Sequence, residues 1–394
     1  MSDRTAVISG ASIAGLSAAY WLASSGWDVT VIERAPSFRD GGQNIDVRGV
    51  AKDVLDRMGL TEAVRAQNTT ETGTVMVDDS GDVVAELPFG GEDGATAELE
   101  VLRGDLARAI LDRLPDGVEL VFDDAIEEVR DDEVVTAGGH RLPADLVVIA
   151  EGVRSRTRDR LFGDEVEKRP LGVTMVFGTI PRRPSDDDRW RWFTTTEGRQ
   201  VHLRPDNRGT TRAILAFTDD DGLAGLEHGE AMGLLRERYD DAGWEAPRVL
   251  DELATSSDVY VDDLTQVRVG TWHRGNVVLT GDAAWCVTPM GGGGASLALT
   301  SGYVLASSFS QHPDDTAAAI AAYEDWMRPL VEDAQTMPRW VIPFAYPQSR
   351  VGVAARRVAD KVFTAKVFEP VTAKITAIAE TDRELPPAPV DVRD

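Results

Sequence analysis

The sequence predicts an α/β protein in which a parallel-sheet domain is interleaved with an antiparallel-sheet domain and is followed by C-terminal helices. Two observations lead to this fold class. The segments 5–9, 29–32 and 146–149 are short and mostly apolar, as in strands buried on both faces of a parallel sheet, and helical patterns lie between them. Residues 170–270 instead hold several aromatic-rich strand patterns, which indicates an antiparallel sheet.

The N-terminal unit is the most regular. A strand at 5–9 leads through a tight turn into a helix at 13–25, which Gly26 stops, and a second strand at 29–32 ends at Glu33. Strand, helix and parallel strand within about 30 residues form a βαβ unit, whose crossover is right-handed in nearly all proteins. The unit indicates a Rossmann-like domain.

The remaining elements follow from the same patterns. Further helices are expected at 50–58, 106–114 (with Asp105 as its N-cap), 231–241, 294–309, 316–328 and 354–378, the last interrupted at Pro370. Further strands are expected at 74–77, 83–87, 118–122, 126–130, 133–136, 173–180, 190–195, 200–203, 212–218 and 276–280. These elements predict one domain from 1–70, 96–165 and 268–330, a second from 71–95 and 166–267, a helical region at 331–380 and an extended tail at 381–394.

Composition and charge restrict the classes of partner. The 394 residues carry a formal net charge of −26, so the chain repels nucleic acid and anionic membranes, and we expect it to bind neither. The one cysteine, Cys286, permits no intrachain disulfide, and the five scattered histidines predict no metal site. Neither a leader nor a membrane-length apolar segment is recognisable, so we expect a soluble cytoplasmic protein, monomeric or homodimeric.

The turn Gly10-Ala11-Ser12-Ile13-Ala14-Gly15 almost matches the dinucleotide-binding pattern G-x-G-x-x-G. Gly10 permits the turn, a small residue such as Ser12 lets a diphosphate approach, and Gly15 permits close packing of helix on strand. The diphosphate would lie at the helix N-terminus, where free N–H groups favour anions. Glu33, 18 residues after Gly15, stands where a ribose-binding carboxylate belongs and argues against a 2′-phosphate. A glycine-rich turn without a ligand is the alternative.

Two further strand ends carry polar motifs. One strand leads into Glu151-Gly152 and a run of arginines ending at Arg158, for which a solvated basic helix start is the alternative. The strand at 276–280 leads into Gly281-Asp282, whose carboxylate can bind a hydroxyl group. The glycines at 291–294 then open a helix, and its N–H groups can face a phosphate or an electron-rich ring. A flexible loop is the alternative for the glycines.

In this order, and with Arg103 before a helix, these motifs resemble those of the single-component FAD-dependent aromatic hydroxylases, the p-hydroxybenzoate hydroxylase class. The resemblance covers about residues 4–330, and residues 40–47 and 101–106 further resemble the tetracycline-inactivating flavin monooxygenases. It implies an FAD-binding domain interleaved with a substrate-binding domain. It also implies an enzyme that uses NAD(P)H and O2 to hydroxylate an aromatic or polyketide-like small molecule through a flavin C4a-hydroperoxide.

The resemblance also implies site residues. The residues expected to bind FAD are Gly10, Ser12, Ile13, Ala14, Gly15, Glu33, Arg34, Arg103, Gly281, Asp282, Pro289, Gly292, Gly293, Gly294 and Ala295. The residues expected to bind substrate are Asp46, Arg48, Met175, Phe177, Trp192, His202, Arg204, Phe217, Pro289 and Met290. No second G-x-G-x-x-G pattern is recognisable for NAD(P)H, so the choice between NADH and NADPH is open.

His202 is the candidate general base, because phenol hydroxylation benefits from a deprotonated substrate; a core or surface histidine is the alternative. The aromatic residues of the sheet are likewise either a pocket for a flat substrate or plain core. Three positions depart from the family pattern: Glu151 replaces the usual aspartate, Trp285 a frequent histidine and Ser296 a frequent asparagine. These departures keep open a ligand-sequestering protein that retains FAD with little turnover. A flavin reductase or dehydrogenase on the same fold is the other alternative.

Overall fold

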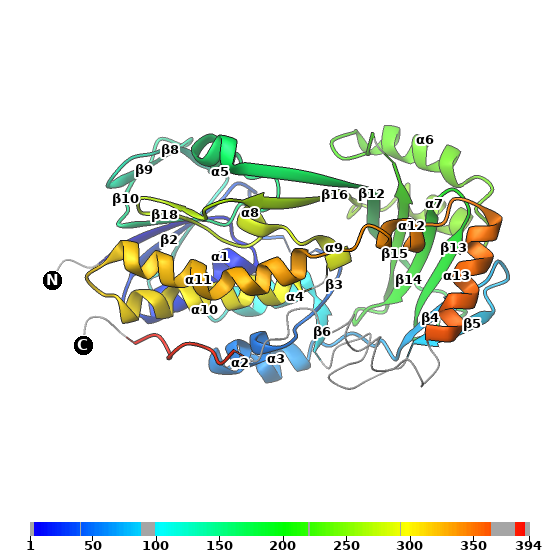
Figure 1. The fold of residues 1–394 in the computed structure, drawn as a ribbon, viewed down its shortest axis with the longest axis horizontal. Coiled ribbons are helices and arrows are strands. Elements are labelled where there is room, and N and C mark those ends of the chain that lie inside the picture. Colours follow the sequence, from blue (N-terminus) through cyan, green and yellow to red (C-terminus); the bar gives the residue numbers. More distant parts are fainter. Residues whose placement is uncertain are drawn as a thin grey trace.

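The computed structural model describes residues 4–39, 41–87, 99–219, 221–291, 293–363 and 383–390. The molecule is elongated, and its two large sheets lie one after the other along the long axis (Figure 1). Parallel and antiparallel sheets together with C-terminal helices confirm the predicted α/β class.

The first large sheet is parallel apart from one edge strand. Its strands in spatial order are β17 (His273–Arg274), β18 (Val277–Leu279), β11 (Leu146–Ile149), β1 (Thr5–Ser9), β2 (Asp28–Glu33) and β7 (Glu119–Phe122), with β17 antiparallel. Ile8 lies opposite Val31 in β2 and Val148 in β11, and all three are buried. The apolar runs of the sequence are therefore its central strands, as predicted.

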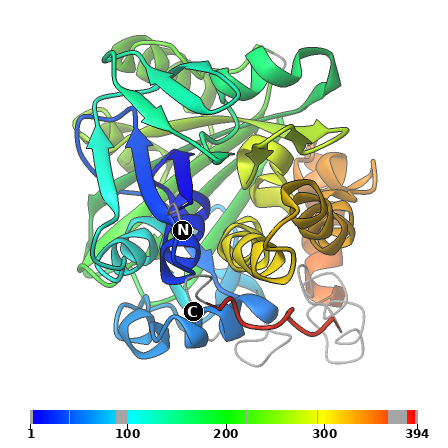
Figure 2. The same cartoon turned by 90° about the vertical axis from the view of Figure 1, so that its left-hand side faces the viewer.

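Helices α1 (Ile13–Ser24), α10 (Gly294–Gln311) and α11 (Thr316–Gln335) run side by side next to this sheet, with α10 in the middle (Figure 2). Gly302 permits the close approach of α10 to α1, because a Cβ there would lie 2.4 Å from Ala18 N. Ser17 Oγ donates a hydrogen bond to Leu299 O at 2.6 Å across the same contact.

Smaller elements complete this part of the molecule. Its shorter helices are α2 (Val50–Arg57), α3 (Thr61–Arg65), α4 (Arg103–Leu111), α5 (Arg156–Phe162), the 3₁₀ turn η1 (Gly163–Glu165), α8 (Asp282–Trp285) and α9 (Thr288–Gly291). Its small antiparallel sheets are β8 (Ile126–Val129), β9 (Glu133–Thr136) and β10 (Arg141–Pro143), and the pair β3 (Asn44–Asp46) and β6 (Glu100–Leu102).

The second large sheet is antiparallel except for one parallel contact between β4 and β13. Its strands in spatial order are β16 (Tyr260–Val269), β12 (Val166–Pro181), β15 (Thr210–Thr218), β14 (Arg199–Pro205), β13 (Trp190–Thr195), β4 (Thr74–Val77) and β5 (Val83–Leu87). The long strands β12 and β16 run as a pair from the first part of the molecule into the second (Figure 1).

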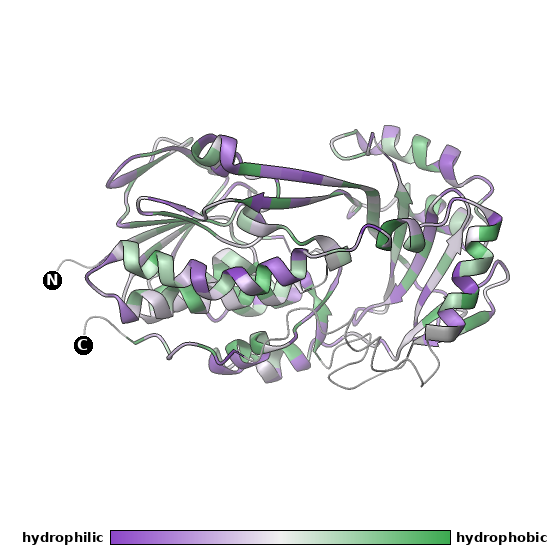
Figure 3. Ribbon diagram, in the orientation of Figure 1, coloured by the Kyte–Doolittle hydropathy of each residue, from purple (hydrophilic) through white to green (hydrophobic). Residues whose placement is uncertain are grey.

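The two faces of this sheet have different covers. One face packs under α6 (His228–Tyr239) and α7 (Ala246–Leu253). The other face carries Met175 and Phe177 and packs against Tyr346, which follows α12 (Val341–Ala345). Helix α13 (Arg350–Phe363) lies at the β4–β5 end, and both α6 and α13 alternate hydrophilic and hydrophobic residues along their length (Figure 3).

The C-terminal tail returns to the first part of the molecule. Residues 383–390 have no helix or strand, in keeping with the predicted extended tail, and they run along α10. Tyr303 Oη and Ser307 Oγ of α10 donate hydrogen bonds to Pro386 O and Pro387 O, each at 2.7 Å. The predicted helix at 354–378 begins at Arg350, and its part from 364 onward lies outside the described residues.

Two expectations about local structure were wrong. Asp105 does not cap α4, because the helix already begins at Arg103 and Leu102 is its N-cap. Strand β16 and helix α7 were not anticipated within 242–270, since polar residues that the fold buries, such as Arg248 and Gln266, interrupt their apolar pattern. In the described ranges no helix is long and apolar enough to cross a membrane. The same residues contain no group of three or more His, Cys, Asp or Glu side chains that is arranged to hold a metal ion.

Candidate cofactor and substrate site

The turn at 10–15 connects the carboxyl end of β1 to α1, and both of its glycines are sterically required. Gly10 has φ +111°, and a Cβ there would lie 2.3 Å from Ala150 O. A Cβ on Gly15 would lie 1.9 Å from Gly10 O. Gly10 N donates to Ile32 O at 2.7 Å, which fixes the turn between the central strands. The N-terminus of α1 therefore opens at the carboxyl edge of the parallel sheet, where ligands bind in such folds.

Ser12 is the N-cap of α1, but its hydroxyl does not cap the helix. Ser12 Oγ instead accepts a hydrogen bond from Arg103 Nη2 at 2.9 Å. The N–H groups of Ile13, Ala14 and Gly15 in the first turn have no partner within the helix. A guanidinium and a helix N-terminus thus lie together, and both favour an anionic diphosphate.

Two carboxylates border this turn. Glu33 at the end of β2 accepts hydrogen bonds from Ala11 N at 2.9 Å and Ala35 N at 2.8 Å, and the neighbouring Arg34 is exposed. Asp282 begins α8, and its side chain is exposed. Desolvation by the protein atoms around the carboxylate raises its pKa, whereas the charge of Arg103 lowers it. Protein atoms surround this carboxylate on some sides, but its exposed side faces open space. A ligand hydroxyl requires such a space.

Of the later glycine motifs, the one at Gly281 meets the same turn, and the other begins α10. Gly281 has φ +58° and would place a Cβ 2.7 Å from Ala14 Cβ, so a larger residue would push α8 away from α1. Gly293, with φ +68°, is the N-cap of α10, which begins at Gly294 and Ala295. Gly292 lies outside the described residues. Three glycine-dependent contacts therefore gather around one helix N-terminus, and these residues fit the diphosphate and ribose of a dinucleotide such as FAD.

The substrate-side residues lie mainly on the face of the second sheet that packs against Tyr346. Met175 and Phe177 of β12 are buried in an apolar cluster with Tyr346. Met290, one residue after the exposed Pro289, packs against the same cluster, and Tyr346 Oη lies 3.9 Å from its sulfur. The apolar face is thus continuous with the glycine-rich turn that precedes α10.

An aromatic cluster extends this face along β13 and β14. The rings of Trp192 and His202 are stacked, with centroids 4.6 Å apart and planes 9° from parallel. Trp190 meets Trp192 edge-on at 4.7 Å and His202 at 5.9 Å. His202 Nε2 lies 3.0 Å from Gln200 Oε1. Burial, together with the charges of Arg204 and Arg356, lowers the pKa of His202 to about 3. A group this weakly basic is poorly suited to remove a phenolic proton near neutral pH, which argues against the general-base hypothesis.

Arg204 is already occupied by protein groups. Its Nε lies 2.6 Å from Glu71 Oε2 and its Nη2 lies 2.7 Å from Glu100 Oε2, while its guanidinium stacks 3.9 Å from the centre of the Trp190 ring. Burial raises the pKa of Glu71 to about 7, against the opposing charge of Arg204. Arg204 therefore joins three elements of the protein and does not offer a free charge to a substrate, contrary to its expected role.

Phe217 lies on the wrong face for a substrate contact. It is fully buried in the cluster under α6, where its ring meets Tyr239 at 6.2 Å. Its neighbour Ala216 points to the face that carries Phe177. Successive residues of a strand alternate between faces, so Phe217 points to the face opposite the one that carries Met175 and Phe177.

Asp46 and Arg48 form an ion pair of 3.0 Å next to the start of α10. Ser296 Oγ donates to Asp46 O at 3.2 Å and accepts from Arg48 N at 3.0 Å. The serine that departs from the family pattern therefore fixes this segment to the helix that follows the glycine-rich turn. Trp285, the second departure, is fully buried and packs on Trp272 at 4.4 Å.

Glu151, the third departure, is saturated with hydrogen bonds. Its Oε1 accepts from Ser9 Oγ and Thr157 Oγ1, each at 2.7 Å. Its Oε2 accepts from Ser155 Oγ at 2.7 Å and Thr157 N at 3.1 Å. The Glu151 side chain, longer than that of the usual aspartate, thus connects the end of β1 to the start of α5. Both of its oxygens are used in these hydrogen bonds, so neither is free to bridge the flavin and the nicotinamide.

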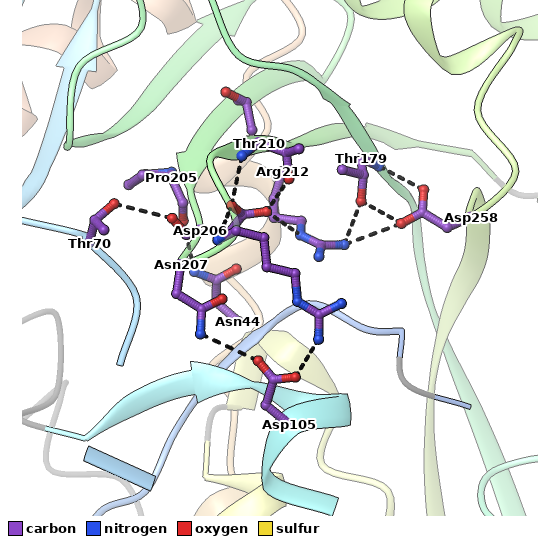
Figure 4. Close-up of polar contacts among 12 residues, drawn as sticks. Asn44, Thr70, Asp105, Thr179, Pro205, Asp206, Asn207, Thr210, Arg212 and Asp258 are labelled. Atoms are coloured by element: carbon purple, nitrogen blue, oxygen red, sulfur yellow. Dashed lines mark hydrogen bonds and ion pairs between the residues drawn. The ribbon is translucent and has the colours of Figure 1, made fainter. Parts of the chain in front are cut away.

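The loop between β14 and β15 connects the two parts of the molecule (Figure 4). Asp206, 1% exposed, accepts hydrogen bonds from Arg208 N and Thr210 N, each at 2.9 Å, which fixes the loop. Arg208 then pairs with Asp105, and Asn207 Nδ2 donates to the same carboxylate at 3.4 Å. The substrate sheet is therefore tied to α4, the helix that carries Arg103. These long-range pairs left no signal in the sequence.

A separate cavity of about 230 Å³ lies on the α6 side of the second sheet. Arg154, His228 and Tyr260 line it together with an apolar floor that includes Val176 and Leu235. Burial raises the pKa of Tyr260, and the charges that act on this group include those of Arg103 and Asp282. The cavity therefore lies on the face of the second sheet opposite the aromatic face, and Tyr260 in its wall is within range of the charges of Arg103 and Asp282.

The fold and this arrangement define a flavoprotein class in which a dinucleotide-binding unit adjoins an aromatic substrate sheet. The chain belongs to the FAD binding domain family, which matches residues 3–336. It is a member of the FAD-dependent monooxygenases, and FAD is its cofactor.

Named relatives are similar over nearly the whole chain. The uncharacterized protein Rv1260 of Mycobacterium tuberculosis is 35% identical over 356 residues, 87% of this chain and 95% of its own. The flavin-dependent monooxygenase eupH of Phoma sp is 31% identical over 388 residues, 90% of each chain. The crystal structure of tetracycline destructase Tet(55) superposes with a TM-score of 0.81 at 29% identity, over 98% of this chain and 99% of its own.

Proposed function

We propose that this protein is a cytoplasmic monooxygenase that uses NAD(P)H and O2 to hydroxylate an aromatic or polyketide-like small molecule. The observation that carries the proposal is the continuity between the glycine-rich turn and the aromatic sheet face, which Met290 makes through its contact with the cluster around Phe177. The name of eupH supports a monooxygenase, and the name of tetracycline destructase Tet(55) supports a polycyclic, tetracycline-like substrate for this face.

The residues of the first part would hold the cofactor. The helix N-terminus at 13–15 and Arg103 would bind the FAD diphosphate, while Glu33 would bind the adenosine ribose and Asp282 the ribitol side. Gly294 and Ala295 would present backbone N–H groups below the flavin ring. Bound FAD would supply the activation of O2, a chemistry that side chains alone do not provide.

The residues of the second sheet would orient the substrate and exclude water. Met175, Phe177 and Tyr346 are each less than 10% exposed, so a ring held against them would be largely desolvated. Exclusion of water matters here because oxidising intermediates otherwise decay without product. Trp192 and His202 would fix the orientation of the ring through their polar edges.

We also propose that the 230 Å³ cavity receives part of the pyridine nucleotide. Arg154 is an exposed cation at its wall, and Tyr260, 46% exposed, offers a ring for stacking. A phosphate and an aromatic base are the groups that such a pair binds. In a chain with a net charge of −26, an anionic coenzyme requires a local positive site of this kind.

The test uses purified protein and four measurements: the flavin absorbance, NADH and NADPH oxidation with phenols and tetracyclines, product formation, and 18O incorporation from 18O2. The expected result is bound FAD, substrate-stimulated coenzyme oxidation and one 18O atom in the product. Reduction of a substrate without 18O would support a reductase instead. Bound FAD and ligand without stimulated oxidation would support sequestration. Absence of bound FAD would contradict the whole scheme.

A further inference from the structure

Three polar atoms of the aromatic cluster have no hydrogen-bond partner in the described part of the chain. They are Trp190 Nε1, Trp192 Nε1 and His202 Nδ1, and each is covered by surrounding atoms. Buried polar groups without a partner are rare in proteins and call for an explanation. Three of them on neighbouring strands, in rings whose centroids lie 4.6–5.9 Å apart, form a cluster that a bound ligand would satisfy.

The chemical character of His202 Nδ1 is set by a chain of hydrogen bonds. Gln200 Nε2 donates to Ala345 O at 2.8 Å, so its Oε1 is free to accept. His202 Nε2, 3.0 Å from that oxygen, must therefore carry the hydrogen. With the proton on Nε2 in the neutral ring, Nδ1 presents a bare lone pair. This chain of hydrogen bonds thus leaves His202 Nδ1 as a hydrogen-bond acceptor beside the two indole N–H donors of Trp190 and Trp192.

The electrostatic surroundings favour a neutral ligand. Two cations act on His202: Arg204 is paired with both Glu71 and Glu100, and Arg356 is paired with Asp360. Because each of these charges is compensated, they do little to stabilise a phenolate. The low pKa of His202, about 3, keeps its ring uncharged as well. A neutral hydroxyl can still donate to Nδ1, because donation requires only the lone pair.

We propose that Trp190, Trp192 and His202 recognise a neutral hydroxyl and a carbonyl on a flat ring system in which the two groups are too far apart to hydrogen-bond to each other, as in 2-hydroxyanthraquinone. The hydroxyl donates to His202 Nδ1, and the carbonyl oxygen accepts from an indole N–H of Trp192 or Trp190. The proposal rests on the proposed function, since it names the substrate class of that site. Both tryptophans are half-buried, and the covered N–H groups require a rotation of an indole ring for the ligand to reach them.

The test compares two ligands that differ in one free donor, 2-hydroxyanthraquinone and 2-methoxyanthraquinone, at pH 6, where the hydroxyl is neutral. Their dissociation constants are measured by fluorescence titration of the FAD-loaded protein. The wild type should bind the hydroxy compound about tenfold more tightly, the scale of one lost hydrogen bond at a buried acceptor. His202→Phe, which keeps a stacking ring but removes the acceptor, should reduce this ratio to about one.

Two further variants separate recognition from folding. His202→Asn places an amide oxygen near the position of Nδ1 and should keep most of the preference for the hydroxyl. Trp192→Phe keeps the ring and removes one N–H, so it should weaken both quinones equally. A ratio that stays near tenfold in His202→Phe would overturn the proposal, as would a wild type that does not distinguish the two ligands.

The outcomes also distinguish this inference from the proposed function. Oxygen incorporation into another substrate, without discrimination between the two quinones, would contradict the inference and leave the proposed function intact. Discrimination between the quinones without any coenzyme-dependent oxygenation would support the recognition cluster and contradict the proposed function.

Discussion

Ser12 Oγ accepts a hydrogen bond from Arg103 Nη2 at 2.9 Å, across 91 positions of sequence. Ser12, which replaces the second glycine of the pattern, thus holds Arg103 beside the helix N-terminus. Gly42, with φ +141°, makes room for this arginine, because a Cβ there would lie 3.0 Å from Arg103 Cβ. The serine therefore holds Arg103 at the N-terminus of α1, where we propose that the FAD diphosphate binds.

Arg103→Leu should weaken FAD binding by about 10- to 100-fold, the range expected for loss of a charge-assisted hydrogen bond to the diphosphate. Ser12→Gly should keep FAD and weaken it by less than about tenfold, since only the anchor of the arginine is removed. Titration of apoprotein with FAD, followed by quenching of flavin fluorescence, gives both constants. Equal affinity of Arg103→Leu and wild type would contradict the assignment.

Gly10→Val and Gly15→Val should each abolish flavin retention. A side chain at either position meets backbone atoms within 2.3 Å, so the turn must deform. Gly229→Ala in α6 is the matched control, because a Cβ there has no neighbour within 4 Å. The ratio of flavin to protein absorbance after gel filtration is the measurement. A yellow Gly15→Val protein would show that the turn is not the FAD site.

Glu71 should make the protein less stable as pH rises. Burial raises its pKa from 4.5 to about 7 in the folded state, so the folded protein binds this proton more tightly than the unfolded chain does. The resulting stabilisation is complete below pH 4.5 and is lost as pH rises through 7, a change of about 3 kcal/mol.

Glu71→Gln should remove this component. Urea unfolding at pH 5, 6, 7 and 8 should show the wild type losing stability relative to Glu71→Gln over this range. Glu62→Gln is the control, since Glu62 is an exposed carboxylate on α3 with a surface ion pair. An identical pH dependence for wild type and Glu71→Gln would contradict the prediction.

Glu151→Ala should destabilise the FAD-loaded protein by about 1–3 kcal/mol, because Ser9 and Thr157 lose a shared acceptor. Glu151→Asp, which restores the usual family residue, should be intermediate, since the shorter arm cannot reach both partners. Urea denaturation followed by tryptophan fluorescence measures the free energies. A Glu151→Asp protein as stable as wild type would show that the longer arm has no structural use here.

Arg154→Gln should raise the KM for NAD(P)H about tenfold or more, because it removes a cation from the wall of the α6-side cavity. FAD content and the KM for the aromatic substrate should not change. Arg156→Gln is the matched control, as Arg156 is also exposed but does not line the cavity. Steady-state kinetics decide the matter, and an unchanged coenzyme KM for Arg154→Gln would exclude this cavity as the coenzyme site.

The sequence predicted the parts of the site that depend on local geometry. Gly10, Ser12 and Glu33 lie within one βαβ unit, where spacing along the chain translates directly into position. The parts that depend on long-range pairing were not predictable. Arg204 has a substrate-like position on β14, but its partners Glu71 and Glu100 lie more than a hundred residues earlier and reveal nothing by spacing.

The aromatic face was predicted in outline and corrected in detail. Period-two alternation along β13 places Trp190 and Trp192 on one face and Phe193 on the other, and the structure buries Phe193 in the cluster under α6. Phe217 lies in the same cluster as Phe193, on the face opposite its expected position. His202 illustrates a different limit, because its low pKa arises from burial and from the two arginines around it, neither of which its sequence position reveals.

The β12–β16 ribbon has a mechanical consequence. It runs from the first part of the molecule into the second, and its ladder is interrupted between Pro170 and Thr174, where Gly172 adopts φ +65°. A ribbon bends most easily where pairing is missing. We therefore expect any rocking of one half against the other to pivot at this point, so the stiffness of the three residues between Pro170 and Thr174 would set how far the aromatic face can swing toward the flavin.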